Sequence, residues 1–139
     1  MQHEKTIKYE EIKSALMAGH NVSFTFELDF CQHHHPEVNN IIVTGRQRIE
    51  SYMIYRNIDS MECIAFSTQH LTITSNGTPV IEISKYVIKN TDAKNITLKN
   101  YFLAPHDYSA LKDPLFFEGN LGESFIFILH NSSTYNTEK

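Results

Sequence analysis

The chain has few of the residues that mark specialised classes of protein. Its 139 residues include two cysteines, five glycines, four prolines and no tryptophan, with 41% hydrophobic residues. So little glycine and proline excludes a collagen-like or low-complexity chain, and the hydrophobic content excludes a disordered one. No apolar run approaches the roughly 20 residues that a membrane-spanning helix needs. The composition therefore indicates one globular domain with a core of its own.

Basic residues are also scarce. Lys and Arg number 12 against 16 Asp and Glu, which gives a net charge of −4. A mildly acidic surface repels nucleic acid and anionic lipid. We therefore expect no nucleic-acid partner. We also expect a monomer with no membrane span.

The motifs that carry catalysis are missing as well. The sequence has no Gly-x-Ser-x-Gly elbow, no Walker loop, no GxGxxG and no EF-hand loop. His70 lies between two strand patterns, with no acid or nucleophile beside it in the local sequence, so a strand-end histidine is favoured over a general base. The sequence predicts no cofactor and no enzyme, and a metal-dependent or hydrolytic enzyme is the weakest alternative.

A run of histidines follows the first predicted strand. His33 and His35 would point the same way on an extended segment, and Cys31 or Glu37 could join them around zinc. A structural zinc site needs four ligands, and this spacing offers two or three. We therefore interpret the run as an exposed polar loop that holds no required metal.

Hydrophobic periodicity predicts one helix followed by strands. Residues 7–18 have helical spacing and end at Gly19, and from Val22 the period is two. Asn76-Gly77 predicts a hairpin with a two-residue type I′ turn. Short turns between successive strands favour an antiparallel meander. The predicted strands are 22–30, 41–44, 49–55, 63–67, 71–75, 80–88, 96–103 and 125–129.

The expected fold is mainly β, with an N-terminal helix and a curved antiparallel sheet or small β-barrel of about eight strands. Residues 1–130 are expected to form one domain. Residues 131–139 are polar and predict a flexible tail.

The order of motifs resembles the VirK family over roughly residues 7–130. Residues 9–19 and the strand ending at 28–31 resemble the family's opening, while 64–72, 77–80 and 85–87 resemble its middle. The stretch containing Ala65, Phe66 and His70 resembles the family's AF-x-x-x-H motif. The resemblance implies a bacterial, virulence-associated protein that is exported, periplasmic or secreted, and it brings no agreed catalytic residues. The N-terminus has no leader pattern, so we expect a mature form, with a cytoplasmic protein as the alternative.

Export bears on the two cysteines. Cys31 and Cys63 each lie at an end of a predicted strand, and their even number permits one disulfide about as well as two buried thiols. An oxidising compartment would favour the bridge.

The expected function is binding of a protein partner. The best contact candidates are Leu115, Phe116 and Phe117, which follow Pro114 in a loop-like stretch. Such a segment either plugs the open end of the sheet, which we favour, or forms an exposed contact patch. The alternative function is a small barrel that carries an apolar ligand.

Overall fold

The computed structural model describes residues 3–28, 31–35 and 43–131. Within these ranges the chain forms one helix and nine strands, arranged in two antiparallel sheets. The elements in chain order are β1 His3–Ile7, α1 Tyr9–Met17, β2 Val22–Glu27, β3 Thr44–Arg48, β4 Met53–Arg56, β5 Glu62–Ile73, β6 Pro79–Lys89, β7 Ile96–Leu103, β8 Leu115–Gly119 and β9 Phe125–Asn131.

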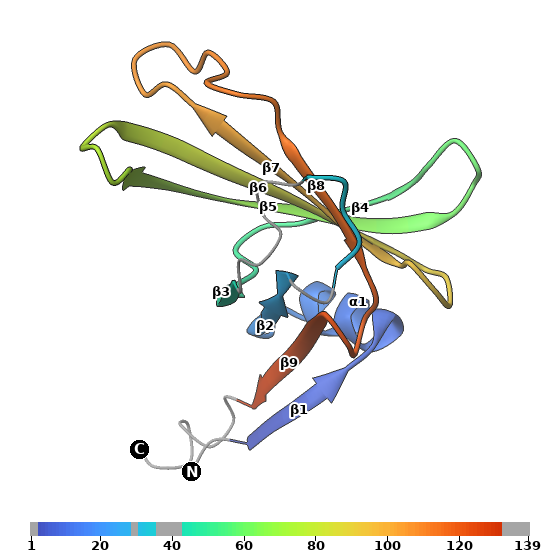
Figure 1. Cartoon of the computed structure of the whole chain (residues 1–139). Coiled ribbons are helices and arrows are strands. Elements are labelled where there is room, and N and C mark those ends of the chain that lie inside the picture. Colours follow the sequence, from blue (N-terminus) through green and yellow to red (C-terminus); the bar gives the residue numbers. More distant parts are fainter. Residues whose placement is uncertain (1–2, 29–30, 36–42, 132–139) are drawn as a thin grey trace, which may run out of the picture.

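The two sheets differ in how the chain builds them. The five-stranded sheet is a meander in which β4 to β8 follow one another in space as in sequence. The four-stranded sheet has the order β1-β9-β2-β3 and joins both ends of the described chain through the pairing of β1 with β9. Figure 1 shows the five-stranded sheet lying across the four-stranded one, with α1 beside the smaller sheet.

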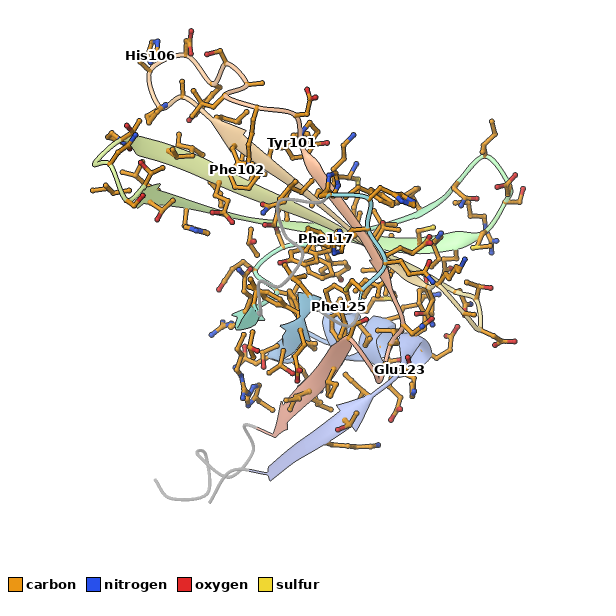
Figure 2. The ribbon with its side chains drawn as sticks, viewed as in Figure 1. Tyr101, Phe102, His106, Phe117, Glu123 and Phe125 are labelled. Carbon is orange, nitrogen blue, oxygen red and sulfur yellow. The ribbon has the colours of Figure 1, made fainter. Side chains whose placement is uncertain are left out.

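The core lies between the facing sides of the two sheets. The period-two pattern of β2 directs Phe24 inward, where its ring centroid lies 5.4 Å from that of Phe66 and 4.9 Å from that of Tyr86. From β9, Phe127 stacks on Phe24 at 4.9 Å. Figure 2 shows Phe117 and Phe125 in the same space between the sheets. Aromatic rings therefore fill the interior of the sandwich.

The expectation of a mainly β fold with an N-terminal helix is confirmed. The curved sheet takes the form of two stacked sheets, and the described strands form no closed barrel. The helix begins two residues later than predicted, because residues 3–7 pair with β9 as a strand, and Gly19 follows the helix with φ +79° as a terminating glycine does. The predicted tail beyond Asn131 lies outside the described residues.

One predicted break in the meander is wrong. The patterns at 63–67 and 71–75 belong to a single strand, β5, which pairs with β6 from Cys63 to Ile73. The intervening residues are polar because this part of the strand is not covered by the second sheet, so both of its faces meet solvent.

The β5–β6 hairpin forms where predicted, but its turn is of another type. Thr78 accepts a hydrogen bond from the backbone N–H of Thr74, which leaves a three-residue loop, and Gly77 takes φ +87° while Asn76 does not have a positive φ. A type I′ turn would need positive φ at both residues. The longer loop shifts the register by one residue, and one residue decides which face every side chain takes.

The five-stranded sheet is longer than the sheet that covers it. The ends of β5, β6 and β7 around the 74–78 turn project beyond the four-stranded sheet, at the upper left of Figure 1. On the inner face, Phe66 in the covered half is 5% exposed, whereas the His70 side chain in the projecting half is 51% exposed. The projecting half is therefore the part of the fold that is open to other molecules.

Candidate functional site

The register assigns every side chain of the five-stranded sheet to one of two faces, since residues paired across antiparallel strands share a face. The inner face carries rows such as Phe66–Tyr86–Leu98–Phe117, which belong to the core. The outer face carries the alternate rows, such as Ser67–Lys85–Lys99–Phe116. No described element packs across the outer rows in the way that the four-stranded sheet packs across the inner ones.

The outer face exposes several large apolar side chains. Met53 is 64% exposed, Leu71 65%, Ile73 67% and Phe116 45%. Their partners in the register, among them Ala65 and Lys99, place all four on this face. These four side chains are the exposed apolar part of the outer face. Large exposed apolar side chains on an uncovered sheet face are typical of a protein contact.

A hollow of about 390 Å³ opens on this face where β4 leaves β5. Its wall combines apolar side chains, including Met53 and Tyr101, with the ammonium-bearing side chain of Lys85. Lys99 pairs directly with Lys85 on the next strand, and its Nζ lies 5.5 Å from the Tyr101 ring centroid. The hollow is therefore apolar with a positive border.

The segment Leu115, Phe116 and Phe117 is a strand, β8, and the expectation of a loop is wrong. The alternation of a strand divides the three residues between the faces. Leu115 and Phe117 are 7% and 1% exposed and belong to the core, while Phe116 points to the outer face. The segment is thus core on one side and contact surface on the other, so neither a whole plug nor a whole patch describes it.

The family-motif residues lie on β5 and take different faces. Ala65 faces outward beside Met53, whereas Phe66 is in the core. His70 lies opposite Glu82 on the inner face beyond the second sheet, with His70 Nε2 3.6 Å from Glu82 Oε2. The acid partner that local sequence did not reveal therefore comes from the neighbouring strand.

Glu82 begins a short chain of buried polar groups. Asn100 Nδ2 donates to Glu82 Oε1 at 3.3 Å, and Asn100 Oδ1 accepts from Ser84 Oγ at 3.0 Å. Beyond them a groove of about 460 Å³ runs between the 74–78 turn and Phe102, where Lys112 Nζ lies 4.2 Å from the ring centroid. These two bonds satisfy the Ser84 hydroxyl and the Asn100 side chain at the point where the covering sheet ends.

His33 and His35 point the same way, as predicted for an extended segment. Their rings lie 6.1 Å apart at 9°, and both face Phe117. His33 Nδ1 accepts from the backbone N–H of His35 at 3.2 Å, and His35 Nε2 accepts from the N–H of Phe116 at 2.8 Å. These lone pairs, which a metal would need, are used in hydrogen bonds that cover the edge of β8.

No group of three or more His, Cys, Asp and Glu side chains suited to a metal lies among the described residues. Glu37, the other candidate ligand, lies outside them. Within the same ranges, no helix has the length and apolarity needed to cross a membrane.

The predicted bridge between Cys31 and Cys63 is not formed, and both side chains are thiols. Cys31 packs on the inner side against Gly119 of β8, while Cys63 lies on β5 and faces outward beneath Asn57. Three strand spacings of about 4.8 Å separate β5 from β8, whereas a disulfide needs Cα atoms within about 7 Å. Burial raises the pKa of the Cys63 thiol, which keeps it protonated.

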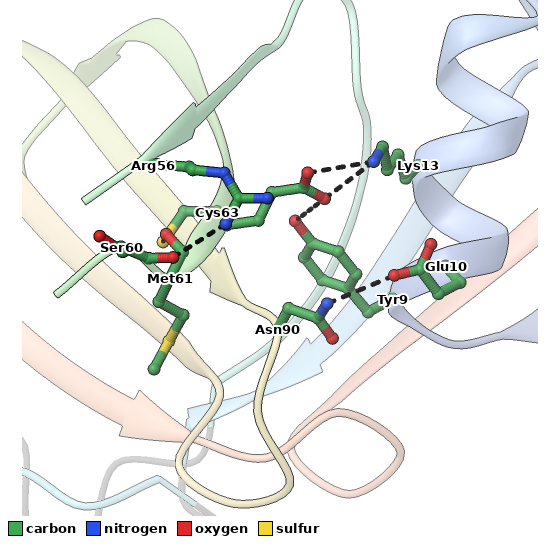
Figure 3. A network of polar contacts seen from close by, with 9 residues as sticks. Tyr9, Glu10, Lys13, Arg56, Ser60, Met61, Cys63 and Asn90 are labelled. Carbon is green, nitrogen blue, oxygen red and sulfur yellow. Dashed lines mark hydrogen bonds and ion pairs between the residues drawn. The ribbon is translucent and has the colours of Figure 1, made fainter.

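A polar network ties the helix to the start of β5 (Figure 3). Glu62 accepts from Tyr9 Oη at 3.0 Å and pairs with Lys13 Nζ at 3.0 Å. The Lys13 ammonium, followed by the Tyr9 hydroxyl, lowers the pKa of Glu62, and burial raises the pKa of Tyr9. The network anchors α1 to the start of β5 at the covered end of the large sheet.

A serine and a histidine meet on the far side of the smaller sheet. Ser23 Oγ lies 2.7 Å from His130 Nε2, and Arg46 Nη2 lies within 3.3 Å of Ser23 Oγ and 3.1 Å of His130 Nε2. Ser23 is 4% exposed. A nucleophilic serine must be open to a substrate carbonyl, so this cluster has the contacts of a nucleophile and base without the access.

Sequence reasoning missed the residues that define the outer face: Met53, Leu71, Ile73 and Tyr101. Each alternates correctly within its own strand, but in an antiparallel sheet with one wet face these positions are usually polar. Apolar residues at positions that are usually polar were the signal in the sequence that could have indicated this surface.

The fold and these surfaces define a two-sheet β protein with one open sheet face. A model of the family described as VirK protein matches residues 5–108, and the chain belongs to the VirK family.

The chain is also similar to a solved structure and to two curated proteins. A crystal structure of lpg1832, a VirK family protein from Legionella pneumophila, superposes with a TM-score of 0.69 at 20% identity, covering 85% of this chain and 92% of that one. An uncharacterized protein in the pinF2 3′ region of Rhizobium radiobacter is 27% identical over 97 residues, 70% of this chain and 64% of that protein. The uncharacterized protein y4wH of Sinorhizobium fredii (strain NBRC 101917 / NGR234) is 29% identical over 90 residues, which cover 65% of this chain and 59% of that protein. The matches span less than two thirds of either relative.

Proposed function

We propose that this VirK protein is exported and virulence-associated, and that it binds a protein partner through the outer face without catalysis of its own. The observation that carries the proposal is the exposure of Met53, Leu71, Ile73 and Phe116 on one uncovered sheet face. Leaving such side chains in water has a free-energy cost of about 25 cal/mol per Å², which contact with a partner removes.

The filled interior favours a protein partner over an enclosed apolar ligand. Phe24, Phe66, Tyr86, Phe125 and Phe127 occupy the space that a lipid or similar molecule would need. Non-catalytic action is supported by the limited access to Ser23 and by the use of His33 and His35 as hydrogen-bond acceptors.

Site-specific photo-crosslinking tests the outer face. A photoreactive residue at position 53 or 116 should give adducts with a partner in bacteria grown with host cells. Position 17 is the matched control, since Met17 is as exposed as Met53, 64%, but lies on α1. Adducts from position 17 alone, or none from 53 and 116, would contradict the proposal.

Export is tested by fractionation of the full-length gene product carrying a C-terminal tag. The proposal predicts the tagged protein in the periplasm or medium. Recovery in the cytoplasm alone would contradict export and leave the outer-face proposal standing.

A further inference from the structure

We propose that the open edge of β5 binds an extended segment of the partner by strand addition, with a carboxylate of that segment beside Lys85. This inference rests on the proposed function, because it states how the partner would dock at the outer face. It also names the chemistry of the docking segment: a strand with apolar residues on one face and an acidic residue near one end.

Among the described residues this edge is open, because β4 is much shorter than β5. β4 pairs with β5 only from Glu62 to Ala65, and β5 continues to Ile73. Beyond Ala65 no described strand lies on that side. Figure 1 shows this arrowhead half of β5 projecting away from the four-stranded sheet.

Hydrogen-bond alternation identifies the backbone groups at this edge. Asn90 N–H donates to the Glu62 carbonyl and Thr74 N–H to the Thr78 carbonyl, so every second residue of β5 from Glu62 to Thr74 bonds to β6. The residues between them direct N–H and C=O to the other side, and none of those groups beyond Ala65 takes part in a backbone hydrogen bond between described residues. These residues are Ser67, Gln69, Leu71 and Ile73.

The edge lacks the features by which proteins protect such strands. Edge strands are usually blunted by lysine or other charges, by proline, by a bulge or by a covering segment. Residues 66–73 contain no charged residue and no proline, and they pair with β6 without a bulge. Another extended polypeptide strand matches the spacing of these backbone donors and acceptors at every position.

The hollow beside Lys85 favours an acidic side chain at one position of the added strand. A strand that continues the line of β4 places one side chain opposite Ser67, over the hollow that Lys85 borders. No ion pair between described residues uses Lys85 or its neighbour Lys99. A carboxylate at that position supplies the counter-charge, and apolar residues further along cover Leu71 and Ile73.

A second copy of this chain fits the edge less well. Two β5 edges paired about a two-fold axis at His70 would set Ile73 of one copy opposite Ser67 of the other. That arrangement brings an isoleucine and no carboxylate to Lys85, so the charge complementarity favours a foreign segment.

An NMR titration of the full chain with two synthetic peptides tests the inference. Both alternate valine and threonine; one carries a terminal glutamate and the other a lysine in its place. We expect the glutamate peptide to shift the amide signals of Gln69 and Leu71 and to bind at least tenfold more tightly. Lys85→Glu should reverse that preference, and Met17→Ser should leave it unchanged.

Gln69→Pro removes an N–H that the fold does not use, so it should abolish peptide binding while the melting temperature stays close to that of the wild type. If this variant fails to fold, Lys85→Glu still decides the question. Binding of neither peptide, or equal binding of both, would overturn the inference. A concentration-dependent dimer without peptide, abolished by Gln69→Pro, would replace the foreign segment with a second copy.

Failure of this inference differs from failure of the proposed function. If photo-adducts still form at positions 53 and 116 in the Gln69→Pro variant, the outer face binds a partner without strand addition. If no adducts form at those positions even in the otherwise unmodified chain, the proposed function itself has failed.

Discussion

The covered and projecting halves of the five-stranded sheet are built from the same strands and differ in what lies against them. In the covered half, Phe66 and Tyr86 pack among the rings of the smaller sheet, and burial raises the pKa of Tyr86 to about 12. In the projecting half, the His70 side chain on the same inner face is 51% exposed, and no described strand pairs with β5 on its β4 side beyond Ala65. The difference separates two tasks, because stability comes from the covered half and contact surface from the other.

The largest expected effect on stability contrasts two neighbouring residues of β8, one in the core and one on the outer face. Phe117→Ala should cost about 3–5 kcal/mol of unfolding free energy, because it leaves a cavity among packed rings. Phe116→Ala, one residue away on the outer face, should cost less than about 1 kcal/mol. Urea denaturation of both variants measures the contrast. Equal costs would show that the outer face is also core.

A smaller effect is expected at the boundary between the halves. Asn100→Ala leaves the buried Ser84 hydroxyl without its acceptor and should cost about 1–3 kcal/mol. The double variant Ser84→Ala/Asn100→Ala removes both partners and should recover part of that loss. Thermal unfolding of the three proteins checks this. A double variant as unstable as the sum of the single ones would show that the two residues act independently.

The smallest expected effect is a pH-dependent contribution of Glu62, at the covered end of the large sheet, to the stability of the protein. Lys13 and Tyr9 lower the pKa of Glu62 below that of an unfolded glutamate, so the stabilisation is present above the unfolded value and is lost as pH falls through the folded one. Glu62→Gln should therefore reduce the urea midpoint at pH 7 and make little difference in acid, below the folded pKa. A gap between wild type and variant that stays constant with pH would contradict this assignment.

Much of the covered half was predictable from sequence, because apolar and polar residues alternate strictly along β2 and a bounded apolar run marks β9. The projecting half was harder for a physical reason. Thr68, Gln69 and His70 are polar where both faces of β5 meet solvent, so their run predicts a break that does not exist.

The partner of His70 could not be predicted from the turn signal. A two-residue turn at Asn76-Gly77 would place His70 opposite Ile83, whereas the three-residue loop places it opposite Glu82. The one-residue slip changes both the partner and the face, and only the pairing of the whole strand decides it. β8 was missed because Leu115, Phe116 and Phe117 are apolar on both faces, which hides the alternation.

Amide hydrogen exchange along β5 of the free protein tests the central claim most directly. Thr68, His70 and Thr72, whose backbone groups bond to β6, should exchange slowly, while Ser67, Gln69, Leu71 and Ile73 should exchange at rates close to those of unprotected amides. That alternation is the signature of an open edge. Slow exchange at all seven residues would show that another strand covers the edge and would contradict the account.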